Sequence, residues 1–191
     1  MKEVFNKEIE YIKDKSYKES IKNLLDLVPD YFYEVEASST GKYHPGFALG
    51  EKGLVRHTKV AVRIAKEVLS LECMKEIFTN KEKDLLLIAL ILHDSIKLGN
   101  PREKYTRFDH PLLAGEFIKE NQDKTNFNDK EIKFLVNAIA SHMGEWNTSS
   151  YSDVVLPKPT TKHQIFVHMC DYLASRKFIN VEFDDNNDIK E

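Results

Sequence analysis

Residues 88–99 read IALILHDSIKLG, an apolar run that ends on His93 and Asp94 and is followed by Lys97. All residues in 85–92 are apolar, whereas a surface helix would carry polar residues along one face. The run therefore predicts a helix that is buried on all sides, with its polar end also inside the protein. Ionisable side chains there must be paired, hydrogen-bonded or bound to metal, because burying a bare charge costs several kcal/mol.

The composition restricts the class of protein. The chain has 191 residues, of which 41% are hydrophobic, and this suits one domain with a single core. Its 28 Lys and Arg residues and 31 Asp and Glu residues give a net charge of -3. That balance argues against dedicated nucleic-acid binding and against a basic surface for anionic lipid.

The sequence shows neither a signal peptide nor an apolar run long enough to span a membrane. Cys73 and Cys170 lie too far apart to form a CxxC pair. We therefore expect a cytoplasmic, reduced protein that does not bind membranes. The oligomeric state is left open.

Helical periodicity extends along most of the chain, and no alternating run is long enough for a substantial sheet. The expected fold class is all-α. One or two amphipathic helices are expected within residues 3–27, and an irregular loop over 35–53. Further helices are predicted at 54–72, 81–94, 110–120, 129–143 and 161–179.

Local signals refine this organisation. Asn128 and Glu131 are spaced as a capping box for the helix over 129–143. The segment 144–160 is long enough to suggest a lid or a binding loop. We expect three parts along the chain, which are N-terminal helices packing on the core (1–29), the main domain (30–179) and an acidic, frayed tail (180–191).

Helical geometry points six histidine and aspartate side chains toward the core. They are His57, His93, Asp94, His110, His142 and Asp171. Each alone has an ordinary alternative, such as a histidine bonded to a carbonyl or an aspartate in an ion pair. One metal centre would satisfy all six, whereas otherwise each would need its own partner. Asp94 adjoins His93 and has two carboxylate oxygens, so we predict that it bridges two ions.

This ordered set resembles the metal-binding signature of the HD-domain metal-dependent phosphohydrolase superfamily, in its dinuclear form. The flanking segments also resemble those of the family over roughly residues 30–178, and they are GLVRHT, LILHDSIKLG, DHPLLAGEF, SHMGEW and VHMCDYLASRK. The likeness is closest to the HD domains of some bacterial 3′ to 5′ exoribonucleases and their stand-alone relatives. No OB-fold module precedes the domain in this sequence, which argues against RNA processing. Ser95 and Ile96 replace the aliphatic residue and glycine that many members have.

The resemblance implies a compact helical bundle with a central metal site. It implies that one divalent ion is held by His57, His93, Asp94 and Asp171, and a second by His110, His142 and the other oxygen of Asp94. Manganese, iron, cobalt, nickel, zinc or magnesium would suit such ligands. The implied activity is a phosphohydrolase that acts on a small phosphorylated substrate, a nucleotide or a phosphodiester, through a metal-activated hydroxide.

Other residues near the signature have two interpretations each. Lys97 lies within one helical turn of Asp94 and would stabilise a phosphoryl oxygen in catalysis, or else extend along the surface. His168 precedes Asp171 by one turn and would support the ligands without binding the ion itself. Trp146 would stack on a nucleobase, or else pack the loop on the bundle.

Two further residues are candidates for substrate binding. Arg107, with its neighbours Arg102 and Lys104, would attract an anionic substrate, although charged loops are usually only solvated. His44 would line the pocket mouth, although a loop histidine is more often simply exposed.

Two other functions remain open at this stage. Some members of the superfamily use the same six ligands for a di-iron centre that activates oxygen, and Lys97 would serve there too. A non-catalytic module in which metal braces a ligand-binding bundle is the third interpretation. Metal analysis with an aerobic and anaerobic comparison would separate these functions.

Overall fold

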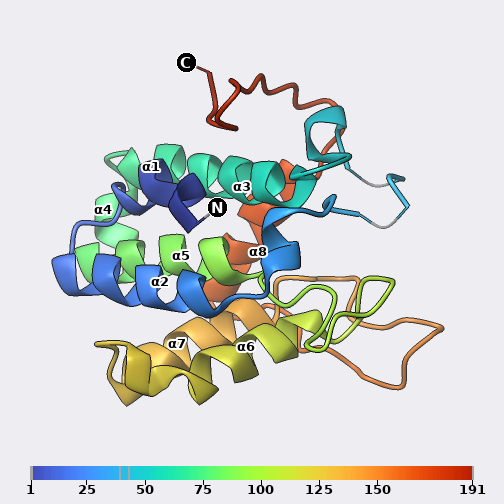
Figure 1. The fold of residues 1–191 in the computed structure, drawn as a ribbon. Helices are drawn as coiled ribbons and strands as arrows, with labels where there is room; N and C mark the ends of the chain where they lie inside the picture. Colours follow the sequence, from blue (N-terminus) through green and yellow to red (C-terminus); the bar gives the residue numbers. More distant parts are fainter. Residues whose placement is uncertain (1, 39, 43, 191) are drawn as a thin grey trace.

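The computed structural model describes residues 2–38, 40–42 and 44–190. Met1 and Glu191, the outermost residues of the two predicted terminal segments, lie outside this description. The helices are η1 (Lys2–Phe5), α1 (Asn6–Ile9), α2 (Lys15–Leu27), η2 (Asp30–Tyr33), η3 (Gly46–Ala48), α3 (Gly53–Ser70), α4 (Met74–Ile77), α5 (Asn80–Leu92), α6 (His110–Glu120), η4 (Gln122–Lys124), α7 (Asp129–Ala140) and α8 (Lys162–Ala174). The all-α class is confirmed (Figure 1).

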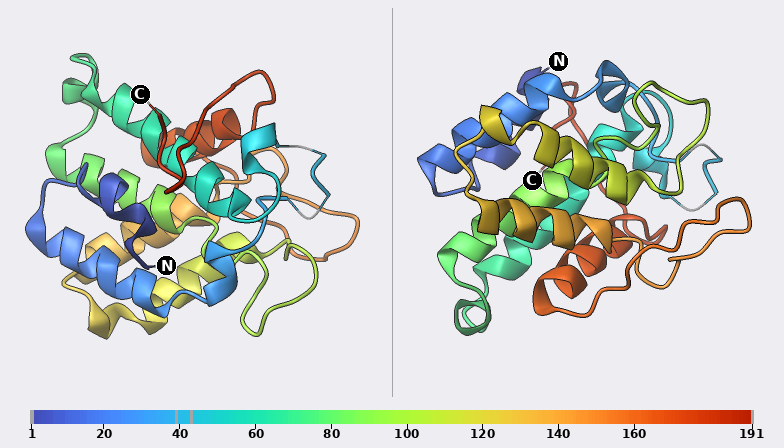
Figure 2. Two further views of the ribbon diagram at one scale, coloured as in Figure 1. Left: turned by 45° about the horizontal axis from the view of Figure 1, so that its top comes forward. Right: turned by 90° about the horizontal axis from the view of Figure 1, so that it is seen from below.

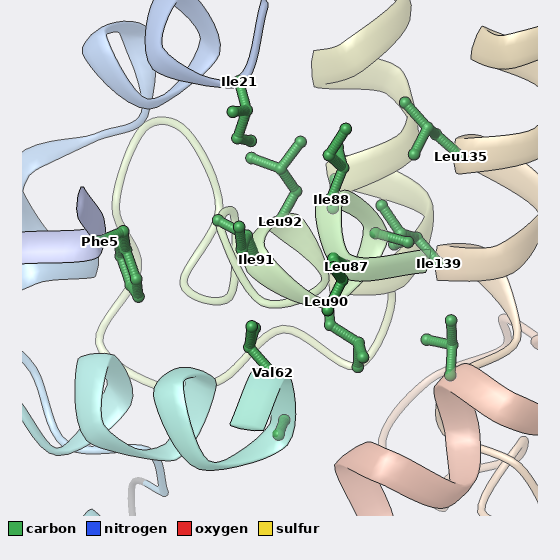
Figure 3. Packing of buried hydrophobic residues seen from close by; sticks show 14 of the residues in the cluster. Phe5, Ile21, Val62, Leu87, Ile88, Leu90, Ile91, Leu92, Leu135 and Ile139 are labelled. Atoms are coloured by element: carbon green, nitrogen blue, oxygen red, sulfur yellow. The ribbon is translucent and has the colours of Figure 1, made fainter. Parts of the chain in front are cut away.

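Helix α5 lies at the centre of the bundle and packs against α3, α7 and α8. Every residue from Leu85 to Leu92 is buried, and none is more than 4% exposed. Figure 3 shows Ile21, Val62 and Leu135, from three different helices, around this apolar segment. Each fully buried leucine or isoleucine stabilises the fold by about 1.5–3 kcal/mol, so this helix anchors the core.

Side-chain caps fix where the helices around the core begin. The predicted capping box of Asn128 and Glu131 is present at α7, and equivalent boxes begin α5 (Thr79 and Glu82) and α8. These caps satisfy backbone amides that would otherwise lack partners at the helix starts.

Several helices end earlier than periodicity predicts. Helix α5 ends at Leu92, α7 at Ala140 and α8 at Ala174. Each is followed by a turn in which an amide bonds to the carbonyl three residues earlier, as His142 N does to Ile139 O at 3.1 Å. After α5 and α7 the next residues stay buried although they have left the helix, and they are His93, Asp94, Ser141 and His142.

The long connections gather at one end of the bundle. Segments 98–109 and 144–160 extend from the end at which α5 finishes, α6 starts and α7 finishes (Figures 1 and 2). Polar residues that precede or follow these helices are therefore brought together in space. Among the described residues, no helix is long and apolar enough to cross a membrane.

Both terminal segments pack on the bundle. Phe5, Ile9 and Ile21 belong to the same buried cluster as α5. The tail was expected to be frayed, and the structure differs: it lies along α3 (Figure 2), where Asp188 pairs with the fully buried Lys59. A buried ammonium needs a carboxylate partner, and this need holds the polar tail in place.

Candidate metal centre

The six polar residues singled out in the sequence meet at the loop end of the bundle. His57 lies on α3 and Asp171 on α8. His93 and Asp94 directly follow the last residue of α5, and His110 is the first residue of α6. His142 lies in the turn after α7. All four histidines and Asp94 are at most 2% exposed.

One group of these residues surrounds oxygen Oδ2 of Asp94. His93 Nε2 is 3.4 Å and His57 Nε2 is 4.0 Å from this oxygen. Asp171 Oδ1 closes the group, at 2.9 Å from His57 Nε2 and 3.5 Å from His93 Nε2. The ligand atoms of His57, His93 and Asp94 lie close enough together to hold one metal ion.

A second group surrounds the other oxygen of Asp94. His110 Nε2 lies 3.0 Å and His142 Nε2 lies 3.7 Å from Oδ1. The two Nε2 atoms are 3.1 Å from each other. This group also has the spacing of a metal site, so Asp94 faces two candidate ion positions with different oxygens.

Backbone carbonyls fix the tautomers of three of these histidines. The Nδ1 atoms of His93, His110 and His142 lie 2.7, 2.7 and 2.9 Å from the carbonyl oxygens of Leu90, Arg107 and Ile139. A carbonyl only accepts, so each Nδ1 donates and each neutral ring presents an Nε2 lone pair to the centre. Lone pairs that face a carboxylate repel it, and a cation between them removes the repulsion.

The electrostatics of the cluster agree with a need for positive charge. Burial opposes the charged form of Asp94, but Lys97 and His93 hold its pKa well below the usual range. Burial would lower the pKa of His93, yet Asp94 and Asp171 raise it. Burial lowers the pKa of His142 to about 3, so His142 is neutral at physiological pH and able to bind a metal.

Lys97 lies at the same centre. Its Nζ donates to Oδ2 of Asp94, and the residue is 8% exposed. Tyr31 holds the segment that carries Lys97, because its hydroxyl donates to Gly99 O at 2.9 Å and accepts from Leu98 N at 3.2 Å. No motif or spacing in the sequence singles out Tyr31, which belongs to the separate 3₁₀ helix η2.

His44 lies against the candidate ligand His57. Their ring centroids are 5.0 Å apart in an edge-on arrangement. Burial lowers the pKa of His44 to about 3, and the neighbouring His57 and Lys97 contribute to this shift. The buried Nδ1 atoms of both rings have no hydrogen-bond partner among the described residues, so His44 adds an uncommitted polar atom beside the centre.

Arg107 reaches the site through its backbone. Its carbonyl oxygen accepts from His110 Nδ1, while its guanidinium donates to Asp109 Oδ1 and Oδ2 at 2.8 and 2.7 Å. Glu103 pairs with the same guanidinium. The side chain predicted to attract substrate is therefore engaged by two carboxylates, and the residue orients a histidine of the centre.

His168 and Trp146 form an outer layer behind His142. His168 Nδ1 donates to His142 O at 2.7 Å, so it supports the turn that carries His142. Trp146 packs on α8 by stacking on Tyr172 and remains 46% exposed. Tyr172 directly follows Asp171 in the sequence, but its aromatic contact could not be predicted from that position.

The sequence that forms this site matches a known protein family. The family model described as the HD domain matches residues 54–176, a range that includes all six residues of the centre. No curated protein and no solved structure matches the chain in the corresponding searches. The HD superfamily consists mostly of metal-dependent hydrolases. The match covers more than half of the chain, and the protein therefore belongs to the HD domain family.

Proposed function

We propose that this protein is a metal-dependent phosphohydrolase that acts on a small phosphorylated substrate, a nucleotide or a phosphodiester. The observation that carries the proposal is the position of Asp94, whose two oxygens face two separate groups of histidines at 3.0–4.0 Å. A carboxylate that faces two candidate ion positions suits a pair of divalent cations.

The ligand assignment follows from the two groups. His57, His93, Asp94 and Asp171 would hold one ion, and His110, His142 and Asp94 would hold the other. A bound pair would supply Lewis acidity and a water of lowered pKa for attack on phosphorus. The histidines are pre-oriented by the carbonyls of Leu90, Arg107 and Ile139, so little ordering is required on metal binding.

Two residues of the chain would act on the substrate. Lys97 presents a buried ammonium beside Asp94, where it would stabilise charge that develops on a phosphoryl oxygen. His44 would offer its unpartnered Nδ1 to a polar group of the substrate. Both side chains belong to segments between helices and are held in place by buried neighbours.

The proposal is tested by metal reconstitution followed by a hydrolysis screen. The purified protein is stripped with a chelator, reloaded separately with manganese, iron, cobalt, nickel, zinc or magnesium, and assayed with p-nitrophenyl phosphomonoesters, phosphodiesters and nucleotides. We expect release of p-nitrophenol, phosphate or nucleoside that depends on the metal and is lost in Asp94→Ala. Activity that persists in Asp94→Ala would assign the hydrolysis to a contaminant.

The same preparation separates the alternative functions. Oxygen consumption by the iron-loaded protein, without phosphate release, would indicate an oxygenase. Retained metal without turnover on any substrate would indicate a binding module.

A further inference from the structure

Trp146 is a half-exposed aromatic side chain on the loop that follows His142. Its ring stacks on Tyr172 of α8, with ring centroids 5.7 Å apart and an interplanar angle of 12°. Tyr172 covers part of the indole, and 46% of the residue is still exposed, so part of the ring remains accessible to solvent. An accessible aromatic ring surface accepts the stacking of another planar ring.

Hydrogen bonds on both sides of Trp146 fix its backbone. Trp146 N donates to Met143 O at 3.1 Å. Immediately after it, Asn147 closes the loop, since Asn147 O accepts from Leu156 N at 2.9 Å and Asn147 Nδ2 donates to Leu156 O at 3.1 Å. Leu156 is buried at 1% exposure. The indole is thus positioned before any ligand arrives, which lowers the entropic cost of binding.

The ring beneath Trp146 is also fixed. Arg176 Cζ lies 4.0 Å from the Tyr172 ring centroid, and Arg176 Nε donates to Tyr172 O at 3.1 Å. A guanidinium packed on an aromatic ring stabilises it by a cation–π interaction. Trp146 and Tyr172 therefore form a rigid two-ring stack, which we name the Trp146 platform.

The platform is connected to the candidate metal centre through His168, whose ring also lies 6.0 Å from that of Tyr172. Tyr172 directly follows Asp171, and Trp146 is four residues after His142. His168 joins the two, because it donates to His142 O at 2.7 Å and its ring centroid lies 6.4 Å from that of Trp146.

Gly144 allows the loop that carries Trp146 to pack closely against His168 of α8. Its φ is +61°, and a Cβ there would lie 2.1 Å from Cε1 of His168. A side chain at position 144 would therefore push the loop away from α8.

We propose that the Trp146 platform binds the planar ring of the substrate, a nucleobase, while the phosphoryl group of the same molecule lies at the metal centre. The inference rests on the proposed phosphohydrolase function and gives the substrate class as a nucleotide. Sugar phosphates without a base would make no contact of this kind. Stacking of a base on an aromatic side chain typically contributes about 5- to 150-fold in affinity.

A binding experiment tests the platform directly, because Trp146 is the single tryptophan of the chain. Tryptophan fluorescence of the metal-loaded protein is titrated with adenosine and, in parallel, with ribose. We expect saturable quenching by adenosine and none by ribose. Tyr151→Ala is the matched control, since Tyr151 is a 97% exposed aromatic on the same loop, and it should leave the titration unchanged. Absence of saturable quenching by adenosine would overturn the proposal.

Kinetics then separate substrate binding from a structural role. For adenosine 5′-monophosphate, kcat/KM should fall about tenfold or more in Trp146→Ala and remain near wild type in Trp146→Phe. For ribose 5-phosphate, the same variants should leave kcat/KM unchanged. An equal loss on both substrates would make Trp146 structural and overturn the proposal. If neither compound is hydrolysed, the phosphohydrolase proposal fails for them, and the fluorescence titration alone decides the platform.

Discussion

The Nε2 atoms of His110 and His142 lie 3.1 Å apart, and neither neutral ring places a hydrogen between them. Both rings already donate through Nδ1, to Arg107 O and Ile139 O. Two facing lone pairs inside a protein are unfavourable unless a cation or a proton lies between them. The arrangement therefore makes metal and protons compete for the same atoms.

Metal content and activity should fall together as the pH drops below about 6, near the ordinary pKa of histidine. Metal is lost on lowering the pH because a protonated imidazole has no lone pair for the ion, and a lower pH increases the fraction of protonated imidazole. Asp94 and Asp171 raise the pKa of His93, so metal binding at neutral pH should also release protons. Mass-spectrometric metal content after dialysis between pH 5 and 8, with calorimetry in two buffers, measures both effects. Full metal content at pH 5 would contradict ligation by histidine.

Lys97→Ala should keep the metal and lower kcat by about 100-fold or more, as removal of one charge-stabilising donor does elsewhere. The lysine pairs with Asp94, but the carboxylate retains four neighbouring histidines when the ammonium is removed. Metal content and steady-state kinetics are measured on the same preparation, with Lys97→Arg as the charge-retaining control. Loss of metal, or unchanged kcat, would remove the assigned role.

The sequence was most informative where a chemical requirement was local. The apolar run over 85–92 indicated a buried helix, and the ionisable pair at its end then had to be compensated inside the protein. The structure places His93 and Asp94 there with at most 1% exposure. The position of His142 was also indicated, although a turn after α7, and not a longer helix, directs it inward.

Contacts between distant segments could not be predicted in the same way. The tail is polar and has no periodicity, and its docking depends on Lys59, which looks like an ordinary helix lysine in the sequence. The pairing of Arg107 with Asp109 and Glu103 depends on the shape of the 98–109 loop. The stacking of Trp146 on Tyr172 joins two segments whose relative position only the fold determines.

Asp188→Asn should lower the free energy of unfolding by about 1.5–3 kcal/mol, the usual contribution of a hydrogen bond to a charged group. Lys59 is fully buried, and its other carboxylate, Glu8, is 3.6 Å away. The charge of Lys59 would then be compensated by one carboxylate only. Urea unfolding compares this variant with Asp185→Asn, an exposed aspartate in the same turn. Equal stability of the two variants would mean that the tail does not stabilise the bundle.

Glu82→Gln should destabilise the protein at neutral pH but not at pH 2. Burial opposes ionisation of Glu82, yet bonds from the Thr79 amide, Lys162 and His163 lower its pKa to about 2. A lowered pKa contributes stability above the unfolded value of about 4.3 and loses it as the pH falls toward the folded value. The difference in unfolding free energy, up to about 3 kcal/mol, should shrink between pH 4.5 and 2 in urea titrations. A difference that does not change with pH would contradict the linkage.

Asp94→Ala should remove both ions, whereas His110→Ala should leave about one ion per chain. Asp94 faces both histidine groups, but His110 contributes only to the group at Oδ1. His57, His93 and Asp171 remain around Oδ2 in the second variant. Asp94→Ala should also lower the melting temperature more, because it removes both bound ligands of the folded state. Native mass spectrometry measures the metal content of the two reconstituted variants, and melting curves measure their stability. Wild-type metal content in both variants would rule out a metal site at these six residues.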